Sequence, residues 1–326
     1  MLSFAEKFEE NVKKSPSLPL FFDDANTKGV SYSKIDEISA KVYEYLSNNG
    51  IGKEDFVLIN LPRGVQPIMA LVGIWKAGAA CTIVEENYAP ERVEFIRKDC
   101  GCKAEINSEN WQDIMKLDGK KGYVIADDHD AAFAIYTSGT TGNPKGVLHE
   151  YGDITRCVQS VKISPDEVLV NKNEHGALVA PLNFIASMLF LIYVLYNGIE
   201  LEKPKLYIVS YATLKNPIAL KKFMLEKTIS LTFLTPSYIR MLSGSTGPFL
   251  KTIIVGSEPA NNIYLKNVKA VNTYTMSETC FLVSMFKIDK SYETCPIGKP
   301  PFDLQIKLLD EDGNEVKKRR NRRNMF

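Results

Sequence analysis

The stretch that decides the fold is AAFAIYTSGTTGNPKG, which spans residues 131–146. Its first six residues are apolar and predict a buried β-strand at 131–136. The segment 136–146 then holds four Ser or Thr hydroxyls, three glycines and one lysine, Lys145. Glycines let backbone N–H groups approach an oxyanion closely, and hydroxyls add further donors. The pattern therefore predicts a phosphate-binding loop directly after a strand, with Lys145 as its mobile positive charge.

The spacing inside this loop excludes two common nucleotide-binding motifs. A Walker A loop requires G-x-x-x-x-G-K-[ST]. Here the fifth residue after Gly139 is Pro144, and Lys145 is followed by Gly146. The kinase pattern G-x-G-x-x-G is absent as well. A plain surface loop remains the alternative, although eleven residues of this composition are unusual for one.

Short apolar runs alternate with helical patterns along most of the chain. Strands are expected at 56–61, 81–84, 104–106, 123–126, 131–136, 230–234 and 250–255, and helices at 65–76, 90–99, 217–226 and 237–242. This alternation is typical of parallel, doubly wound sheets covered by helices. Beyond Cys295 the pattern becomes β-like, with a strand at 303–309, a hairpin turn at Asp312-Gly313 and a return strand from 315. The predicted class is α/β with a small β element at the end.

Length and charge bound the function classes. The 326 residues are about twice a typical domain, and 45% hydrophobic with 24% charged residues excludes a disordered chain. The formal net charge of +1 is the sum of two unlike parts, because residues 317–326 hold six Lys or Arg and no Asp or Glu. The other 316 residues hold 34 basic and 39 acidic residues, a net charge of −5. We therefore expect no nucleic-acid partner for the acidic body, although the basic tail alone could serve as a nucleic-acid or membrane patch.

The remaining composition favours a cytoplasmic protein. The six cysteines are scattered, no Cys/His spacing suggests zinc, and no signal peptide is evident at the N-terminus. Residues 176–199 carry no charge and are long enough to span a bilayer, but Pro181 and Asn183 interrupt them. The continuous part, Phe184 to Tyr196, has the length of a buried core helix, so no membrane span is expected. Membrane attachment through this stretch and the basic tail stays open as an alternative.

The glycine-rich loop closely resembles the phosphate-binding loop of the acyl-adenylate-forming (AMP-binding) superfamily, which includes acyl- and aryl-CoA ligases, luciferases and peptide-synthetase adenylation domains. Further segments resemble motifs of this superfamily in the same order: SYSKID at 31–36, KAGAA at 76–80, PER at 90–92, GSEP at 256–259, NTYTMSE at 272–278 and PIGKP at 296–300. The NTY form resembles amino-acid-activating members most, such as peptide-synthetase adenylation domains and D-alanine–carrier protein ligases.

The resemblance implies the large N-terminal domain of such an enzyme, with two doubly wound sheet subdomains and an incomplete small β-barrel. It divides the chain into a first α/β subdomain with the phosphate loop, a second with the adenine and acyl pocket, the start of the barrel, and a basic tail. The corresponding ranges are 1–170, 171–294, 295–316 and 317–326.

The activity that the resemblance implies is ATP-dependent activation of a carboxylic or amino acid. The acid becomes an acyl-AMP with release of pyrophosphate, and the acyl group then passes to a thiol of CoA or a carrier protein. Both reactants are anions, so their repulsion must be neutralised and the two must be aligned. The implied cofactors are ATP and Mg²⁺.

The resemblance also carries roles onto individual residues. The β- and γ-phosphates would be held by Thr137, Ser138, Gly139, Thr140, Thr141, Gly142 and Lys145. The adenosine would be bordered by Gly256, Ser257, Glu258, Asn272, Thr273 and Tyr274, with Tyr274 stacked on the base. Ser277 would contact the α-phosphate and Glu278 would hold Mg²⁺, which together with Lys145 makes the implied catalytic set. The acid would be contacted by Asn183, Ile185 and Met276.

Two departures from the family alter the expected substrate and backbone. Amino-acid-activating members usually carry F-D-x-S, whose aspartate binds the ammonium, but residues 184–187 read FIAS with Ile185 in that place. An isoleucine cannot pair with a buried ammonium. We therefore expect an unsubstituted or aromatic carboxylic acid, unless another acidic side chain supplies the contact. Thr275 also replaces a glycine of the motif, so the backbone beside the adenine is expected to shift if that glycine has a positive φ.

A third departure concerns activity. Full members continue with a ribose-binding aspartate in T-G-D and a small C-terminal domain that supplies the catalytic lysine, and residues 1–326 stop before both. The basic residues 317–326 stand where a strand is expected, which favours a truncation or frameshift. We expect weak ATP–Mg²⁺ binding and low activity. A catalytically inactive ATP- or AMP-binding protein with an accessory role is the alternative.

Overall fold

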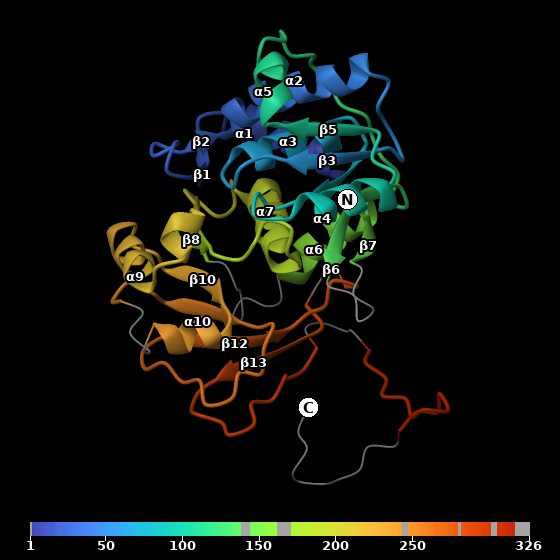
Figure 1. Cartoon of the computed structure of the whole chain (residues 1–326). Helices are drawn as coiled ribbons and strands as arrows, with labels where there is room; N and C mark the ends of the chain where they lie inside the picture. Colours follow the sequence, from blue (N-terminus) through green and yellow to red (C-terminus); the bar gives the residue numbers. More distant parts are fainter. Residues whose placement is uncertain are drawn as a thin grey trace.

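A computed structural model describes residues 2–137, 144–161, 171–242, 247–279, 282–300 and 305–316. Within these residues the strands form two sheets, one of eight strands and one of five, and both are mainly parallel. Figure 1 shows the smaller sheet with α2 and α5 at one end of the molecule, and β10, β12 and β13 of the larger sheet at the other. The predicted α/β class with doubly wound sheets is confirmed.

The five-stranded sheet has the order β5-β3-β4-β6-β7. Its strands are β3 (Phe56–Asn60), β4 (Ala80–Ile83), β5 (Ala104–Asn107), β6 (Ala131–Thr137) and β7 (Lys145–Glu150). The first four run parallel, and β7 returns antiparallel to β6 at the edge. The strand expected before the glycine-rich loop is therefore present, and it is buried along six of its seven residues.

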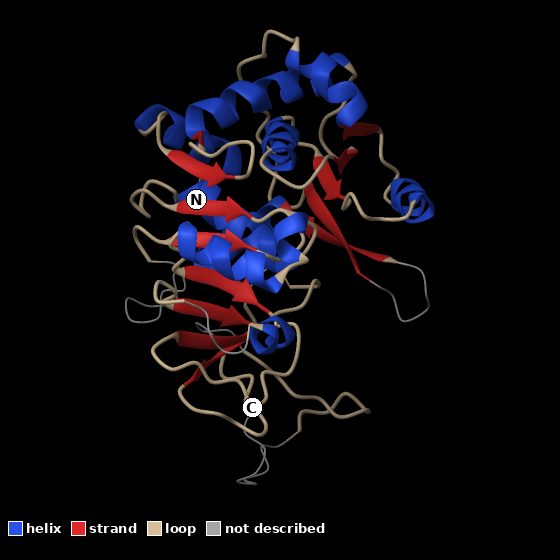
Figure 2. Ribbon diagram, turned by 60° about the vertical axis from the view of Figure 1, so that its left-hand side comes forward, coloured by secondary structure: helices blue, strands red, loops and turns tan. Residues whose placement is uncertain are grey.

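The eight-stranded sheet has the order β13-β12-β11-β10-β8-β9-β1-β2. Its strands are β1 (Pro19–Phe22), β2 (Val30–Ser31), β8 (His175–Leu178), β9 (Lys205–Ile208), β10 (Leu231–Leu234), β11 (Thr252–Val255), β12 (Lys269–Tyr274) and β13 (Ser284–Ile288). Only the two outer strands, β2 and β13, run antiparallel to their neighbours. Figure 2 shows these strands stacked as one tall twisted sheet. The N-terminal strand β1 pairs with β9, so the start of the chain contributes to this sheet.

The helices of the described residues include those expected at 65–76, 90–99, 184–196, 217–226 and 237–242, within one residue at each end, together with others that were not predicted. They are α1 (Phe4–Lys14), α2 (Tyr32–Asn48), α3 (Gln66–Lys76), α4 (Pro90–Asp99), α5 (Ser108–Met115), α6 (Tyr151–Val161), α7 (Ile185–Asn197), α8 (Tyr211–Leu214), α9 (Pro217–Glu226) and α10 (Pro236–Met241). Proline stands in the first turn of α3, α4, α9 and α10, where its missing N–H removes no helical hydrogen bond. Asn216 caps α9 as expected, because its side chain accepts hydrogen bonds from the first amides of the helix.

Helix α7 is the uncharged segment that has the composition of a membrane span. All but one of its 13 residues are buried, and most belong to a core cluster that draws on both sheets. Figure 1 shows it between the two halves of the molecule. The expectation of a buried core helix is confirmed. Because the helix is buried on all sides, apolar residues occur on every face of it. Among the described residues, no helix has both the length and the apolar composition that crossing a bilayer requires.

Two expected strands do not form. Residues 123–126 are irregular, because the Val124 N–H donates to the carbonyl of Lys76 at the end of α3 instead of joining a ladder. Residues 305–308 are also irregular, and Leu309 makes only an isolated bridge with Glu315. The expected turn at Asp312-Gly313 is present, since the Gly313 N–H donates to Asp310 and φ at Gly313 is 82°.

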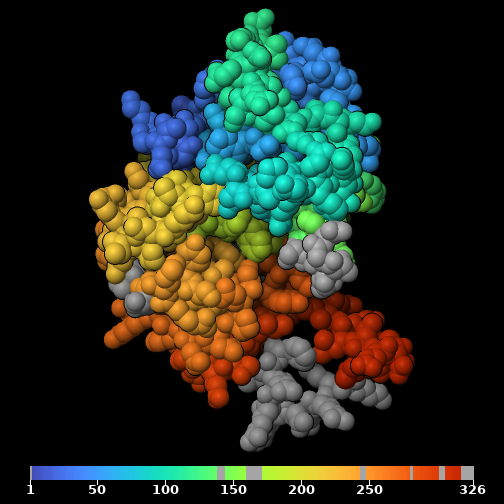
Figure 3. Space-filling view, viewed as in Figure 1, coloured from blue at the N-terminus to red at the C-terminus, as the bar shows by residue number. Residues whose placement is uncertain are grey.

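Every residue of 305–316 is exposed, and Figure 3 shows the end of the coloured chain standing out from the body. The start of a barrel at 295–316 stays a prediction, as do the other three ranges of the division. The basic residues 317–326 lie outside the described residues.

Candidate nucleotide and acid site

The glycine-rich loop is framed by the β6–β7 hairpin. Thr137 ends β6 and faces Lys145, the first residue of β7, in the antiparallel register. The Thr137 hydroxyl donates to the Lys145 carbonyl at 3.5 Å, and the Lys145 side chain is exposed. A strand pair of this kind brings the two ends of the loop together and leaves its one lysine at the surface. Five predicted phosphate ligands, Ser138, Gly139, Thr140, Thr141 and Gly142, lie outside the described residues.

Tyr136 closes the base of this hairpin. Its hydroxyl donates to Asp99 Oδ2 at 2.7 Å, and burial together with this hydrogen bond raises the pKa of Tyr136 above its usual value. Gly146 lies against the ring, since a Cβ at Gly146 would stand 2.9 Å from the Tyr136 Cζ. The glycine therefore lets β7 pass close to the aromatic ring, and the Tyr136 hydroxyl ties the end of β6 to the last residue of α4, Asp99.

The two segments expected beside the nucleotide follow neighbouring parallel strands. Val255, the last residue of β11, is paired with Asn272 in β12, so both strands end at the same edge of the sheet. The Thr273 hydroxyl donates to the Val255 carbonyl at 3.1 Å. Gly256 is buried against this contact, because a Cβ there would stand 3.0 Å from the Thr273 carbonyl oxygen. The register thus places the turn 256–259 beside the segment 272–278.

The side chains of these turns are held by local hydrogen bonds. Asn272 is buried and donates to the Pro296 carbonyl at 2.8 Å, which ties β12 to the PIGKP segment. Glu258 accepts hydrogen bonds from the Ser237 hydroxyl and amide at 2.6 and 3.1 Å, and these bonds lower its pKa. Ser257 has φ at 69°, the left-handed region that a serine adopts only in a constrained turn.

The end of this segment is open to solvent. Tyr274 is 40% exposed and its hydroxyl lies 3.4 Å from the Met276 sulfur, while Met276 is 39% exposed. Such an open aromatic face suits stacking on a base. Ser277 is half-buried and Glu278 is exposed.

The described residues contain no group of three or more His, Cys, Asp or Glu side chains arranged to hold a metal ion. A single carboxylate such as Glu278 still fits Mg²⁺, because this ion is commonly bound through one or two carboxylates plus substrate phosphates.

The residues expected at the acid differ in environment. Ile185, the first residue of α7, is 1% exposed and belongs to the main core cluster. Asn183 is half-buried and donates from Nδ2 to the Tyr88 hydroxyl at 2.7 Å. The pattern FIAS at 184–187 thus begins where the chain passes from a surface turn into a buried helix.

Sequence reasoning missed a buried carboxylate next to this turn. Glu85, two residues after β4, is 5% exposed and accepts hydrogen bonds from the amides of Leu182 and Asn183 at 2.6 and 3.4 Å. Its other oxygen accepts from the Tyr211 hydroxyl. The position of Glu85 between an apolar strand and the Pro90 helix was the available signal, but nothing in the local pattern indicates its distant partners.

Arg63 packs on the ring of Tyr211, the residue whose hydroxyl donates to Glu85. It donates to the carbonyls of Val209, Leu178 and Ala180 at 2.7, 2.8 and 2.9 Å, and its guanidinium carbon lies 5.3 Å from the centre of the Tyr211 ring. Burial lowers the pKa of Arg63, and attraction to Glu85 acts in the opposite direction. The arginine follows β3, so this group joins the two sheets.

Two of the histidines, His149 and His175, have structural environments. His149 is buried, stacks on Phe133 at 4.6 Å and lies 3.5 Å from Asp153. His175 contacts the Thr228 hydroxyl at 2.8 Å. Cys81, Cys100, Cys102 and Cys295 are free thiols, and both Cys100 and Cys102 are half-buried.

The chain belongs to the AMP-binding enzyme family, whose model matches residues 8–321. It thereby falls in the adenylate-forming class that its motifs predicted.

Among curated relatives, the chain is 27% identical to surfactin synthase subunit 1 of Bacillus subtilis (strain 168), over 96% of this chain and 9% of that protein. It is 24% identical to tyrocidine synthase 1 of Brevibacillus parabrevis, over 95% of this chain and 30% of that protein. The chain therefore spans less than a third of the length of these relatives.

Two solved structures share the fold. The N-terminal domain of FACL13 from Mycobacterium tuberculosis matches with a TM-score of 0.82 and 17% identity, covering 97% of this chain and 86% of that chain. The NpsA N-terminal subdomain of Klebsiella oxytoca, in complex with 3-hydroxyanthranilyl-AMSN, matches with a TM-score of 0.82 and 20% identity, covering 97% and 85%.

Proposed function

We propose that this chain binds ATP, Mg²⁺ and a carboxylic acid that lacks an α-amino group, and joins the acid to AMP. A carboxylate oxygen attacks the α-phosphorus of ATP, the bond from that phosphorus to the bridging oxygen breaks, and pyrophosphate leaves. The thiol sulfur of CoA or of a carrier protein then attacks the acyl carbon, the bond from that carbon to the phosphate oxygen breaks, and AMP leaves as the thiol proton is released. We also propose a cytoplasmic location, which the free cysteines support.

The observation that carries the proposal is the Val255–Asn272 register. It brings the turn 256–259 and the segment 272–278 to one edge of the larger sheet, where ligands of open α/β sheets bind. Tyr274 offers an open ring there for the adenine. The proposed adenine site is therefore formed by two chain segments that are brought together by the pairing of β11 with β12.

The charges of the proposed phosphate site are available to a ligand. Among the described residues, the ion pairs include neither Lys145 nor Glu278, and both side chains are exposed. Lys145 would neutralise phosphate oxygens, and Glu278 would hold Mg²⁺, which when bound offsets charge on the same oxygens. Ser277 would donate to the α-phosphate.

The acid is proposed to lack an ammonium group because of Ile185. This residue stands where amino-acid-activating members carry aspartate, and it is buried in the core. Burying an ammonium there without a partner would be costly. Asn183 and Met276 would contact the rest of the acid. Glu85, which contacts the turn leading into α7, is an alternative partner for an ammonium, but its oxygens already accept three hydrogen bonds from the protein.

A polypeptide of residues 1–326 alone is proposed to form the adenylate slowly. The lysine that the family supplies from its small domain is not matched within these residues, although the proposed binding groups are. Binding without efficient chemistry is the expected state of this polypeptide. Turnover near that of two-domain family members would contradict this part of the proposal.

The test is acid-dependent exchange of labelled pyrophosphate into ATP across a panel of aliphatic, aromatic and amino acids. We expect weak exchange with aliphatic or aromatic acids, and loss of that exchange in Lys145→Ala and Glu278→Gln. Lys116→Ala, on the exposed end of α5, is the control and should match the wild type. A clear preference for amino acids would refute the assignment of the acid.

A further inference from the structure

Glu85 lies where the two sheets meet the proposed acid site. It follows β4, and β4 is paired in parallel with β6, whose end carries the glycine-rich loop. Its partners, the turn 181–184 and Tyr211, belong to the segments that follow β8 and β9 of the larger sheet. One carboxylate therefore connects the sheet that carries the phosphate loop with the turn that leads into the acid site.

The contacts of Glu85 define the shape of that turn. Two consecutive amides, Leu182 and Asn183, point at the same carboxylate oxygen, Oε1. The Phe184 amide donates to the Pro181 carbonyl at 3.2 Å, which closes the turn. Helix α7 begins at the next residue, and Phe184 at its N-cap offers no side-chain hydrogen bond. The carboxylate thus fixes the two residues that come immediately before the N-cap, and it anchors the turn rather than the helix amides themselves.

The far end of the turn is held by an aromatic side chain, Tyr88, which lies just before the PER segment at 90–92. The Asn183 amide group donates to the Tyr88 hydroxyl, and the Arg92 guanidinium carbon lies 4.1 Å from the centre of the Tyr88 ring. Asn183 is therefore positioned from two directions, by Glu85 through its backbone and by Tyr88 through its side chain. Both anchors lie in 85–88, the short connection between β4 of the smaller sheet and α4.

We propose that Glu85 is a positioning residue for the acid: it holds the turn 181–184 so that Asn183 and the start of α7 form the wall against which the acyl group packs. This inference rests on the proposed function and assigns Glu85 no contact with the acid. A carboxylate that accepts three protein hydrogen bonds in a buried place is suited to this task, because leaving those donors unpaired would be unfavourable. Loss of Glu85 should weaken recognition of the acyl group and leave recognition of AMP intact.

The chain offers a closely matched control in Glu174. This carboxylate is 6% exposed, close to the 5% of Glu85, and it accepts a hydrogen bond from the Asn171 amide at 2.9 Å. It lies before β8, at the opposite end of that strand from the turn 181–184. Glu174→Ala therefore removes a buried, hydrogen-bonded carboxylate of the same kind without touching the proposed acid wall.

The experiment measures the dissociation constants of AMP and of benzoyl-sulfamoyl-adenosine, a stable analogue of benzoyl-AMP, by calorimetry on the whole chain. In Glu85→Ala we expect the affinity gained from the acyl group to fall about tenfold, with AMP binding changed less than about twofold. Glu85→Gln, which keeps one acceptor for the amides, should lie between, and Tyr211→Phe should lose about threefold. Glu174→Ala should keep the wild-type ratio. Equal losses for both ligands, or an unchanged ratio in all Glu85 and Tyr211 variants, would overturn the proposal.

A second measurement separates this proposal from the proposed function. If wild-type protein binds AMP but gains nothing from any acyl group, the proposed function has failed, and hydrogen exchange at the Leu182 and Asn183 amides decides the role of Glu85. Faster exchange of these two amides in Glu85→Gln than in Glu174→Ala would support the anchoring of the turn. Unchanged exchange would overturn it. If Glu85→Ala does not fold, Glu85→Gln and Tyr211→Phe carry both measurements.

Discussion

The Thr273 hydroxyl in β12 donates a hydrogen bond, at 3.1 Å, to the carbonyl of Val255 in the neighbouring strand β11. This bond ties together the starts of the two segments proposed to border the adenine. The Thr273 side chain is 5% exposed, so water does not replace this bond readily. The bond fixes the turn after β11 relative to the end of β12, and the geometry of the proposed nucleotide site depends on it.

Thr273→Val removes this hydrogen bond with little change in shape. We expect a loss of about 1 kcal/mol in the free energy of unfolding, measured with urea, and a severalfold weaker binding of AMP. Thr232→Val is the matched control, since the buried Thr232 hydroxyl donates to the Ala177 carbonyl at 3.0 Å within the same sheet. It should cost similar stability and leave AMP binding unchanged. Equal AMP binding in the two variants would contradict the role of Thr273.

Gly256→Ala tests the close approach at the same place. The added Cβ would stand 3.0 Å from the Thr273 carbonyl oxygen and 3.2 Å from the Phe233 ring, both of which are held in the sheet. We expect the turn 256–259 to shift and AMP binding to weaken, as measured by calorimetry. Gly52→Ala should be neutral, because a Cβ there meets nothing nearer than 4.0 Å. Tight AMP binding by Gly256→Ala would show that this turn does not border the nucleotide.

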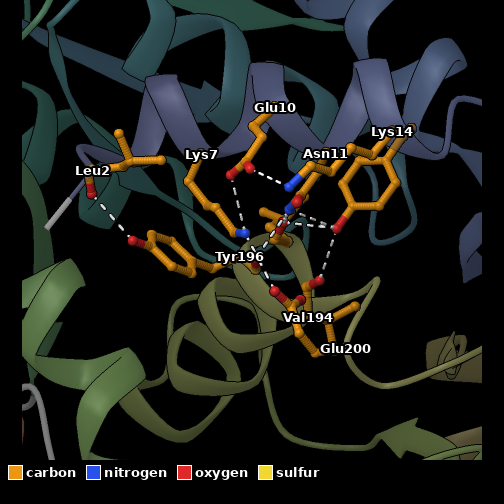
Figure 4. A network of polar contacts seen from close by, with 10 residues as sticks. Leu2, Lys7, Glu10, Asn11, Lys14, Val194, Tyr196 and Glu200 are labelled. Atoms are coloured by element: carbon orange, nitrogen blue, oxygen red, sulfur yellow. Dashed lines mark hydrogen bonds and ion pairs between the residues drawn. The ribbon is translucent and has the colours of Figure 1, made fainter.

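The end of α7 is stabilised by side chains from the N-terminal part of the chain (Figure 4). The Tyr32 hydroxyl donates to the Leu195 carbonyl at 2.9 Å, and Asn11 Nδ2 donates to the Tyr196 carbonyl at 2.9 Å. These donors satisfy helix-terminal carbonyls that lack intrahelical partners.

Tyr32→Phe should therefore lower the free energy of unfolding by about 1 kcal/mol, and Asn11→Ala by about 1–3 kcal/mol, since it also empties a buried polar position. Urea unfolding followed by circular dichroism measures both. Tyr43→Phe, on the outer part of α2, is the control and should unfold like the wild type. No loss in either test variant would mean that these contacts do not support α7.

Stability should depend on Asp153 at low pH. Its hydrogen bonds with His149 and Arg156 lower the pKa of Asp153 below 3.8, its ordinary value. A carboxylate with a lowered pKa contributes stability that is present above the ordinary pKa and is lost as the pH falls below it. Between about pH 5 and pH 2, wild-type protein should therefore lose more stability than Asp153→Asn. Melting temperatures across this range measure the difference, and Asp118→Asn, at an exposed site, should follow the wild type.

Much of the fold was predictable because its signals are local. The apolar run at 131–136 and the capped helix at 217–226 are complete patterns within short windows, and the structure has both. The apolar helix at 184–196 was predictable from its length and its proline boundary. The strand expected at 123–126 does not form because the Val124 amide is taken by the Lys76 carbonyl, a partner that no local pattern reveals.

The candidate site likewise has parts that the sequence predicts and parts that it does not. Its motifs are recognisable in sequence, but the Val255–Asn272 register that brings two of them together follows from sheet order, which local patterns do not contain. Glu85 was missed for the same reason, since its hydrogen-bond partners lie about a hundred residues away in the chain, at 182, 183 and 211.

The most direct test of the account measures binding of benzoyl-sulfamoyl-adenosine, phenylalanyl-sulfamoyl-adenosine and AMP to the chain by calorimetry. The account predicts that the benzoyl compound binds at least about tenfold more tightly than AMP and than the phenylalanyl compound, because Ile185 offers no charge to an ammonium. Tightest binding of the phenylalanyl compound, or binding of none of the three, would contradict it.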